Sequence, residues 1–162
     1  MSAIWVAAPG EAADVARLLR AFRDWFESEE PSAESMAASV ARLIEDPATE
    51  YLLGRADESA PPCGVCQLRF RHSVWTGTPD CWLEDLYVTD DARGRGVGRA
   101  LVELAFERAR LRGAARVELD TNEANATAIA LYESLGFSAT SKVHGPATGR
   151  DIFMGRRLGS PQ

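Results

Sequence analysis

The feature that most constrains the fold is an apolar strand followed closely by a glycine-rich loop and a long amphipathic helix. The strand spans residues 82–88, and the loop reads Arg93-Gly94-Arg95-Gly96-Val97-Gly98-Arg99. In the helix that follows, apolar residues recur at helical spacing and charged residues lie opposite them: Val97, Leu101, Leu104, Ala105 and Leu111 against Glu103, Glu107 and Arg110. We therefore expect a helix that packs on a sheet, with the glycine-rich loop at its N-terminus.

The glycine-rich loop, residues 93–99, is suited to binding phosphate groups. Glycine lets the backbone turn tightly and brings bare N–H groups close to a ligand. Those N–H groups lie at the positive end of the helix dipole, which favours an anion. Arg93, Arg95 and Arg99 add charge-assisted donors for more than one phosphate. The loop predicts a polyphosphate site, with an ordinary glycine-rich turn as the alternative.

Two common phosphate-binding motifs fit the sequence poorly. A P-loop requires a Gly-Lys pair, which the chain does not contain. A dinucleotide fingerprint that starts at Gly94 has Arg99 in place of its third glycine. Glu118 and Asp120, about 20 residues further on, favour that fingerprint. However, the chain lacks the repeated strand–helix units of a dinucleotide-binding domain.

A second motif follows about 25 residues after the loop. A strand over residues 116–119 is expected to lead into an asparagine-rich loop and a short helix. The helix ends at Gly136, a residue typical of a helix C-cap. Asn125 then lies at the start of this helix and Tyr132 two turns further along.

Three segments of the chain resemble the GCN5-related N-acetyltransferase (GNAT) superfamily, whose members transfer an acetyl group from acetyl-coenzyme A to an amine. Arg93-x-x-Gly96-x-Gly98 resembles its pyrophosphate-binding motif. Asn125-x-x-Ala128-x-x-Leu131-Tyr132-x-x-Leu135-Gly136-Phe137 resembles its second motif, and residues 83–88 resemble its fourth strand. The segments follow the family's order and spacing over residues 82–137. The N-terminal half matches only in its pattern of elements.

The resemblance implies acetyl-coenzyme A as co-substrate and no metal. The glycine-rich loop would hold the diphosphate, and the pantetheine arm would insert between splayed fourth and fifth strands. Asn125 would hydrogen-bond this arm, although an asparagine there also serves as a helix cap. The residues implied to bind the co-substrate are Leu86, Tyr87, Val88, Arg93, Gly94, Arg95, Gly96, Val97, Gly98, Arg99, Asn125, Ala128 and Tyr132.

Direct acetyl transfer in a ternary complex needs a neutral amine, a polarised thioester carbonyl and a proton for the departing thiolate. An alkyl amine has a pKa of about 10.4, so the site needs a base. Glu84 is the expected base, acting through water, with Asp85 as substrate anchor or second candidate. Consecutive strand residues point to opposite faces, and a bulge, which is a family feature, would bring both nearer. By resemblance Tyr132 is the general acid. Structural carboxylates and a packing tyrosine are the alternatives.

The acceptor side is expected to include Trp25, Glu29, Glu30 and Trp75, together with Glu84 and Asp85. Carboxylates and aromatic rings suit a cationic amine, although a charged loop and core aromatics give the same composition. Ser73-x-Trp75 followed by residues 83–88 is similar to the spermidine/spermine (diamine) acetyltransferase branch. This implies a primary amine on a small cationic acceptor that is polyamine-like or derived from an amino acid. Aminoglycosides, protein N-termini and a non-catalytic acyl-coenzyme A sensor remain alternatives.

The 162 residues predict a single domain that spans residues 1–162. The net charge of −6 argues against affinity for nucleic acid or anionic membrane. No apolar stretch approaches the ~18 to 20 residues that span a bilayer, and residues 1–5 do not resemble a secretory signal. We therefore expect a cytoplasmic protein. The family often forms homodimers, and the sequence argues neither for nor against one.

The three cysteines, Cys63, Cys66 and Cys81, are interpreted as small buried residues rather than a zinc or redox site. The remaining pattern predicts the order βααβββαβαββ, which fits an α/β fold with one mixed sheet covered by helices. The resemblance implies the same fold. The expected strands span residues 4–7, 51–55, 65–71, 82–88, 116–119, 138–143 and 151–158, and the two N-terminal helices span residues 12–26 and 33–44.

Overall fold

The structure is a computed structural model that describes residues 2–121 and 125–137. Its elements, in chain order, are β1 (Ala3–Val6), α1 (Ala12–Trp25), α2 (Ala33–Leu43), β2 (Thr49–Arg55), β3 (Gly64–His72), β4 (Pro79–Val88), α3 (Val97–Leu111), β5 (Val117–Glu118) and α4 (Ala126–Ser134). The expected element order is confirmed over these residues. The strands expected at residues 138–143 and 151–158 lie outside the described residues.

The chain forms two compact units, Met1–Asn122 and Glu123–Gln162. The first contains the whole described sheet with α1, α2 and α3, and the second contains α4. The expectation of one domain over residues 1–162 stays a prediction.

The first unit is built on one mixed sheet in the order β1-β2-β3-β4-β5. The first four strands pair antiparallel, while β5 runs parallel to β4. In the described part of the chain, β5 pairs with β4 at two positions, Cys81–Val117 and Trp82–Glu118. The α/β class with a mixed sheet is therefore confirmed, and the pairing of β4 with β5 stops well before β4 ends at Val88.

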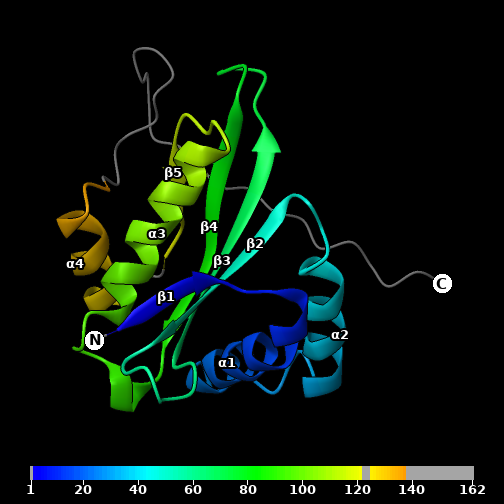
Figure 1. Cartoon of the computed structure of the whole chain (residues 1–162), viewed down its shortest axis with the longest axis vertical. Coiled ribbons are helices and arrows are strands. Elements are labelled where there is room, and N and C mark those ends of the chain that lie inside the picture. The colour runs from blue at the N-terminus through cyan, green and yellow to red at the C-terminus, as the bar shows by residue number, and fades with distance from the viewer. Residues whose placement is uncertain (1, 122–124, 138–162) are drawn as a thin grey trace. The chain divides into compact units, whose positions relative to one another are not determined.

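Helix α3 covers one face of the sheet (Figure 1). Two glycines allow its first turns to approach the strands closely. A Cβ atom at Gly54 would lie 2.9 Å from Cγ1 of Val97, and one at Gly64 would lie 2.8 Å from the same atom. Arg108 also fixes α3 to β2 through two hydrogen bonds to the Glu50 carboxylate, at 2.8 and 2.9 Å. The helix that follows the glycine-rich loop is thus held firmly on the sheet.

Helices α1 and α2 pack on the other face. Alternate strand residues turn to this side and join one buried cluster with the two helices: Val15, Leu18, Leu19, Val40, Tyr51, Leu53, Val65 and Tyr87. Burying each aliphatic side chain contributes about 1.5–3 kcal/mol relative to leaving it exposed. The cluster determines which face of β2, β3 and β4 lies toward α1.

The expected apolar stripe of α3 is only partly correct. Val97, Leu101 and Ala105 are buried, but Leu111 is 75% exposed, and Val102 and Ala109 are buried as well. At about 100° per residue, Leu111 lies roughly a third of a turn from the centre of the buried stripe. The prediction for Leu111 is therefore wrong, while Glu103, Glu107 and Arg110 are exposed as expected.

Candidate active site

The ladder between β3 and β4 contains a β-bulge at Glu84. Asp85 pairs with Gln67 and Leu83 pairs with Leu68, so Glu84 has no partner residue of its own on β3. An extra residue interrupts the alternation of side chains along a strand. Glu84 and Asp85 consequently lie on one face, where Nε2 of Gln67 donates to Oε2 of Glu84 at 3.0 Å. The bulge that the resemblance implies is present.

The environment of Asp85 favours its protonated form. Burial, followed by the negative charges of Glu84 and Asp120, raises the pKa of Asp85 to about 6. Its pKa therefore lies near neutral pH, where a carboxylate can both accept and release a proton.

Tyr51 of β2 completes this group of polar side chains. It pairs with Gln67 and is 1% exposed. Burial, followed by the charges of Asp85 and Glu84, raises the pKa of Tyr51 to about 12, while Arg69 acts in the opposite direction. Tyr51 thus stays a neutral phenol beside two carboxylates. We call Tyr51, Gln67, Glu84 and Asp85 the carboxylate site.

Sequence reasoning missed Tyr51 and Gln67 as members of this site. Gln67 alternates along β3 with Val65, Arg69 and Arg71 and so shares one face of the strand with them. The available signal was a polar amide within that alternating strand. Its partner could not be read from the sequence, because the bulge on β4 decides which residue lies opposite.

The last residues of β4 present main-chain groups at an edge that no strand of residues 2–121 covers. The N–H of Thr89 donates to the Cys63 carbonyl at 2.9 Å, and such bonds alternate along an antiparallel pair. The N–H and C=O groups of Leu86 and Val88 therefore point away from β3. Consistent with this, the Val88 carbonyl accepts a hydrogen bond from Nε of Arg93 at 3.1 Å. An extended ligand chain could pair with this edge as a further strand does.

The glycine-rich loop turns through two left-handed residues, Gly94 with φ 75° and Gly96 with φ 82°. Glycine adopts this conformation without steric cost. A Cβ atom on either glycine would meet nothing within 4 Å, so the backbone conformation, rather than packing, requires glycine there. The first hydrogen bond within α3 runs from the Ala100 N–H to the Gly96 carbonyl at 3.0 Å. The N–H groups of Val97, Gly98 and Arg99 precede this bond, so the helix itself does not use them.

Two of the loop arginines already pair with carboxylates. Arg95 lies 2.7 Å from Asp57, and Arg93 lies 3.2 Å from Asp90. The Arg93 guanidinium also lies 5.5 Å from the Trp25 ring centroid and 6.0 Å from that of Tyr87. A phosphate ligand would therefore have to compete with these carboxylates for both arginines.

Trp25 belongs to an aromatic cluster beside the glycine-rich loop. Phe22 stacks on Tyr87 with ring centroids 5.2 Å apart, and Trp25 meets Phe26 edge-on at 4.9 Å. Tyr87 shares its face of β4 with Asp85, two residues earlier. The structure thus places Trp25 on the face of the carboxylate site, toward the loop.

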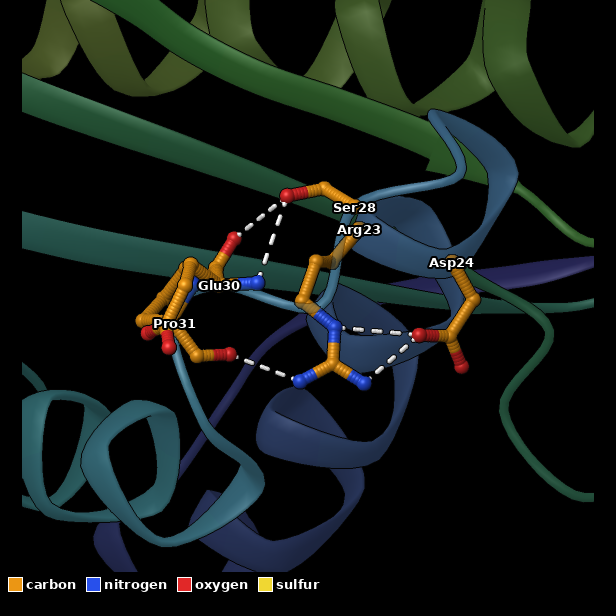
Figure 2. Close-up of polar contacts among 5 residues, drawn as sticks. All are labelled: Arg23, Asp24, Ser28, Glu30 and Pro31. Atoms are coloured by element: carbon orange, nitrogen blue, oxygen red, sulfur yellow. Dashed lines mark hydrogen bonds and ion pairs between the residues drawn. The ribbon is translucent and has the colours of Figure 1, made fainter.

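The loop between α1 and α2 carries Glu29 and Glu30. Figure 2 shows Arg23 donating to Asp24 and to the Pro31 carbonyl at 2.6 Å. The Ser28 hydroxyl donates to the Glu30 carbonyl at 2.8 Å and accepts from its N–H at 3.3 Å (Figure 2). These contacts use main-chain atoms of Glu30 and fold the loop on itself. Contact of either carboxylate with an acceptor stays a prediction.

Trp75 lies in the loop that joins β3 to β4, beyond the His72–Pro79 pair, and is 83% exposed. The glycine-rich loop follows the opposite end of β4. Trp75 and Trp25 are therefore placed at different ends of the β3–β4 hairpin, although both were expected on the acceptor side.

In the second unit, Asn125 caps α4. Its Oδ1 accepts a hydrogen bond from the Ala128 N–H at 3.3 Å. The Tyr132 ring meets Phe137 edge-on at 5.6 Å, and the Phe137 N–H donates to the Tyr132 carbonyl at 3.0 Å. The capping alternative for Asn125 is therefore correct within this unit. Pantetheine binding by Asn125 and Ala128 and acid catalysis by Tyr132 stay predictions.

The cysteines behave as expected for packing residues. Cys66 and Cys81 are buried and Cys63 is partly buried, all as free thiols. Burial raises the pKa of Cys66 well above its usual range and that of Cys81 to about 12, so both thiols stay protonated. Separately, none of the helices within residues 2–121 and 125–137 combines the length and apolar character that crossing a membrane requires.

The fold and the glycine-rich loop agree with a family match. Residues 15–137 match the acetyltransferase (GNAT) family. The chain belongs to this family, which confirms the resemblance found in its sequence.

Two curated relatives show how far the sequence similarity extends. Mycothiol acetyltransferase of Beutenbergia cavernae is 45% identical over 69 residues, which cover 41% of this chain and 23% of the relative. Thialysine N-epsilon-acetyltransferase of Bos taurus is 30% identical over 96 residues, covering 58% of this chain and 56% of the relative. The chain thus matches from about a quarter to about half of the length of these proteins.

A solved structure supports the fold over most of the chain. It is a crystal structure, described as that of an acetyltransferase, from Arthrobacter sp. FB24. The TM-score is 0.81 at 29% sequence identity, and the match covers 96% of each chain.

Proposed function

We propose that this protein is an acetyl-coenzyme A-dependent N-acetyltransferase that acts on the primary amine of a small cationic acceptor. The observation that carries the proposal is the bulge in β4, which brings Glu84 and Asp85 onto one face of the strand. The same strand has an open edge and leads into the glycine-rich loop. Strand β4 thus carries the two carboxylates proposed to accept a proton, offers an edge for a ligand chain, and leads into the turn proposed to bind phosphate.

The co-substrate residues are those of the loop and the β4 edge. The N–H groups of Val97, Gly98 and Arg99 would hold the diphosphate at the start of α3. Main-chain groups of Leu86 and Val88 would pair with the pantetheine arm and help polarise the acetyl carbonyl. Asn125, Ala128 and Tyr132 belong to this set by motif, and residues 1–162 would then work as one catalytic domain.

In the proposed mechanism the carboxylate site takes the proton of the acceptor ammonium. The freed amine attacks the thioester carbonyl, so that the C–N bond forms and the C–S bond breaks. The sequence favours Glu84 as the base and Asp85 as the second candidate, but the burial of Asp85 and its pKa of about 6 lead us to propose Asp85 as the proton acceptor instead. Glu84, oriented by Gln67, would hold the ammonium or a bridging water. Tyr132 is proposed to protonate the departing thiolate, and the second proton that the attacking nitrogen loses on becoming an amide returns to Tyr132.

The acceptor proposal stays with polyamine-like or amino-acid-derived amines. The negative charges of Glu84 and Asp85 suit an ammonium group, and the aromatic cluster suits the same charge through cation–π contact. The thialysine acetyltransferase relative, by its name, acts on an amino-acid amine. Aminoglycosides and protein N-termini are the competing acceptors in the test.

The test combines binding and turnover. Calorimetry should detect coenzyme A and acetyl-coenzyme A binding to the purified chain. Thiol release from acetyl-coenzyme A, followed with a thiol reagent, should then require a primary amine. Binding without thiol release across amines, aminoglycosides and peptide N-termini would favour a sensor over an enzyme. Absence of both signals would refute the proposal.

A further inference from the structure

Beyond the carboxylate site, β3 carries two arginines on the same face. Gln67, Arg69 and Arg71 alternate along the strand and therefore share one side. Trp82, the partner of Arg69 on β4, lies on this side as well, with the Arg71 guanidinium 5.9 Å from its ring centroid. We call Arg69, Arg71 and Trp82 the arginine strip.

The two arginines of the strip differ in how far carboxylates compensate their charge. Arg69 approaches Glu84 only to 3.9 Å, and Glu84 already accepts a hydrogen bond from Gln67. Arg71 is exposed and forms no ion pair with any carboxylate of the described residues. The neighbouring Arg116, in contrast, is neutralised by Asp80 at 3.1 Å and Glu118 at 2.8 Å. The face thus presents negative charge at the carboxylate site and positive charge beside it.

We propose that the acceptor carries an anionic group, such as a carboxylate, in addition to its reactive amine. This inference rests on the proposed function and selects the amino-acid type of acceptor over a polyamine. The amine would lie at Glu84 and Asp85, and the anionic group at Arg69 and Arg71.

The spacing along β3 fits such a molecule. Two residues of a strand span about 7 Å, so Arg69 lies one such step from the Gln67–Asp85 pair and Arg71 lies two steps away. A lysine-length chain between amine and carboxylate bridges the first step. Arginine binds carboxylates through two parallel N–H donors, and the Arg71 guanidinium lies 5.9 Å from the Trp82 ring centroid. A polyamine would instead place a second ammonium group against these arginines, which disfavours it.

Three amines of similar length separate the contributions of charge: 6-aminohexanoate, hexylamine and 1,6-diaminohexane. Each would be compared by kcat/KM from thiol release at saturating acetyl-coenzyme A. We expect kcat/KM for 6-aminohexanoate to exceed that for hexylamine by about tenfold, with the diamine lowest. The preference should appear mainly in KM, because the anionic group lies away from the reacting atoms.

Two variants and one control locate the effect. Arg71→Gln should lower kcat/KM for 6-aminohexanoate by about tenfold more than for hexylamine, and Arg71→Glu should move the preference toward the diamine. Arg71 does not contact Glu84, so its substitution tests the strip without disturbing the carboxylate site. Arg110→Gln removes an exposed arginine of α3, on the opposite face of the sheet, and should leave the preference unchanged.

The outcomes distinguish this inference from the proposed function. Equal kcat/KM for the three amines, unchanged by the Arg71 variants, would overturn the inference while acetyl transfer stands. An equal loss of the preference for 6-aminohexanoate in Arg110→Gln would overturn it too, because the net charge of the protein would then explain the preference. No thiol release with any amine, despite coenzyme A binding, would overturn the proposed function itself.

Discussion

The carboxylate site and the glycine-rich loop lie at the middle and beyond the end of the same strand, yet they are built in opposite ways. At the carboxylate site the groups proposed to act are side chains, held on one face by a bulge and partly buried. In the loop the groups proposed to act are main-chain N–H donors beside two left-handed glycines, and two arginines there pair with exposed carboxylates. Substitution of a side chain should therefore damage the first region far more than the second.

The largest effect is expected at Asp85. In the proposed mechanism, Asp85→Asn removes the proton acceptor and should lower kcat/KM by about 10²–10⁴-fold. The Kd of acetyl-coenzyme A should stay nearly unchanged, because the variant leaves the loop and the β4 edge intact. Thiol-release kinetics and calorimetry measure the two quantities. A variant that loses co-substrate affinity and turnover in parallel would show that Asp85 supports the fold of β4 rather than proton transfer.

In the loop, Gly96→Ala tests the backbone directly. An L-residue in the left-handed conformation costs about 1–2 kcal/mol, so the loop should shift and the affinity for coenzyme A should fall about tenfold. Gly10→Ala is the matched control, since Gly10 has no positive φ and a Cβ atom there meets nothing within 4 Å. Calorimetry compares the two variants. Equal affinities would mean that the left-handed turn does not position the phosphate donors.

The pH dependence of kcat/KM probes how strongly the charge of Glu84 raises the pKa of Asp85. Asp85 acts as base only when ionised, so activity should rise with pH and pass its midpoint near the Asp85 pKa of about 6. An alkyl amine stays protonated over this range, so the midpoint of the pH profile reports a group of the protein rather than the acceptor. Glu84→Gln removes a like charge and should move the midpoint to lower pH. An unchanged midpoint would assign the titration to another group.

The same shift has a consequence for stability. Because the folded pKa of Asp85 exceeds its usual value of 3.8, folding favours the protonated form. Its contribution to stability is full below about pH 3.8 and is lost as pH rises through about 6. We therefore expect the Tm of Asp85→Asn minus the Tm of the wild type to be more positive at pH 8 than at pH 4. A stability difference that is constant with pH would contradict the raised pKa.

The two regions also differ in how far the sequence predicts them. Gly94 and Gly96 require a turn whatever surrounds them, so the loop and the start of α3 were correctly predicted. The placement of Glu84 beside Asp85 depends on the register between β3 and β4, which only pairing determines; the family resemblance, rather than alternation, pointed to it. Tyr51 and Gln67 were missed for the same reason. The prediction for Leu111 was wrong because spacing counted along one row of apolar residues does not reveal where the centre of the buried stripe lies.

The smallest effect is expected from the ion pair between Arg95 and Asp57. Both side chains are about half exposed, and such pairs contribute roughly 0.2–1 kcal/mol. Asp57→Asn should release Arg95 for a phosphate and raise the affinity for coenzyme A by up to about fivefold. The gain should shrink at high salt, which screens exposed charges. Asp14→Asn is the matched control, because it breaks the exposed pair of Asp14 with Arg17 within α1. An equal gain in both variants would show that the change in net charge, rather than the freed Arg95, attracts the phosphates.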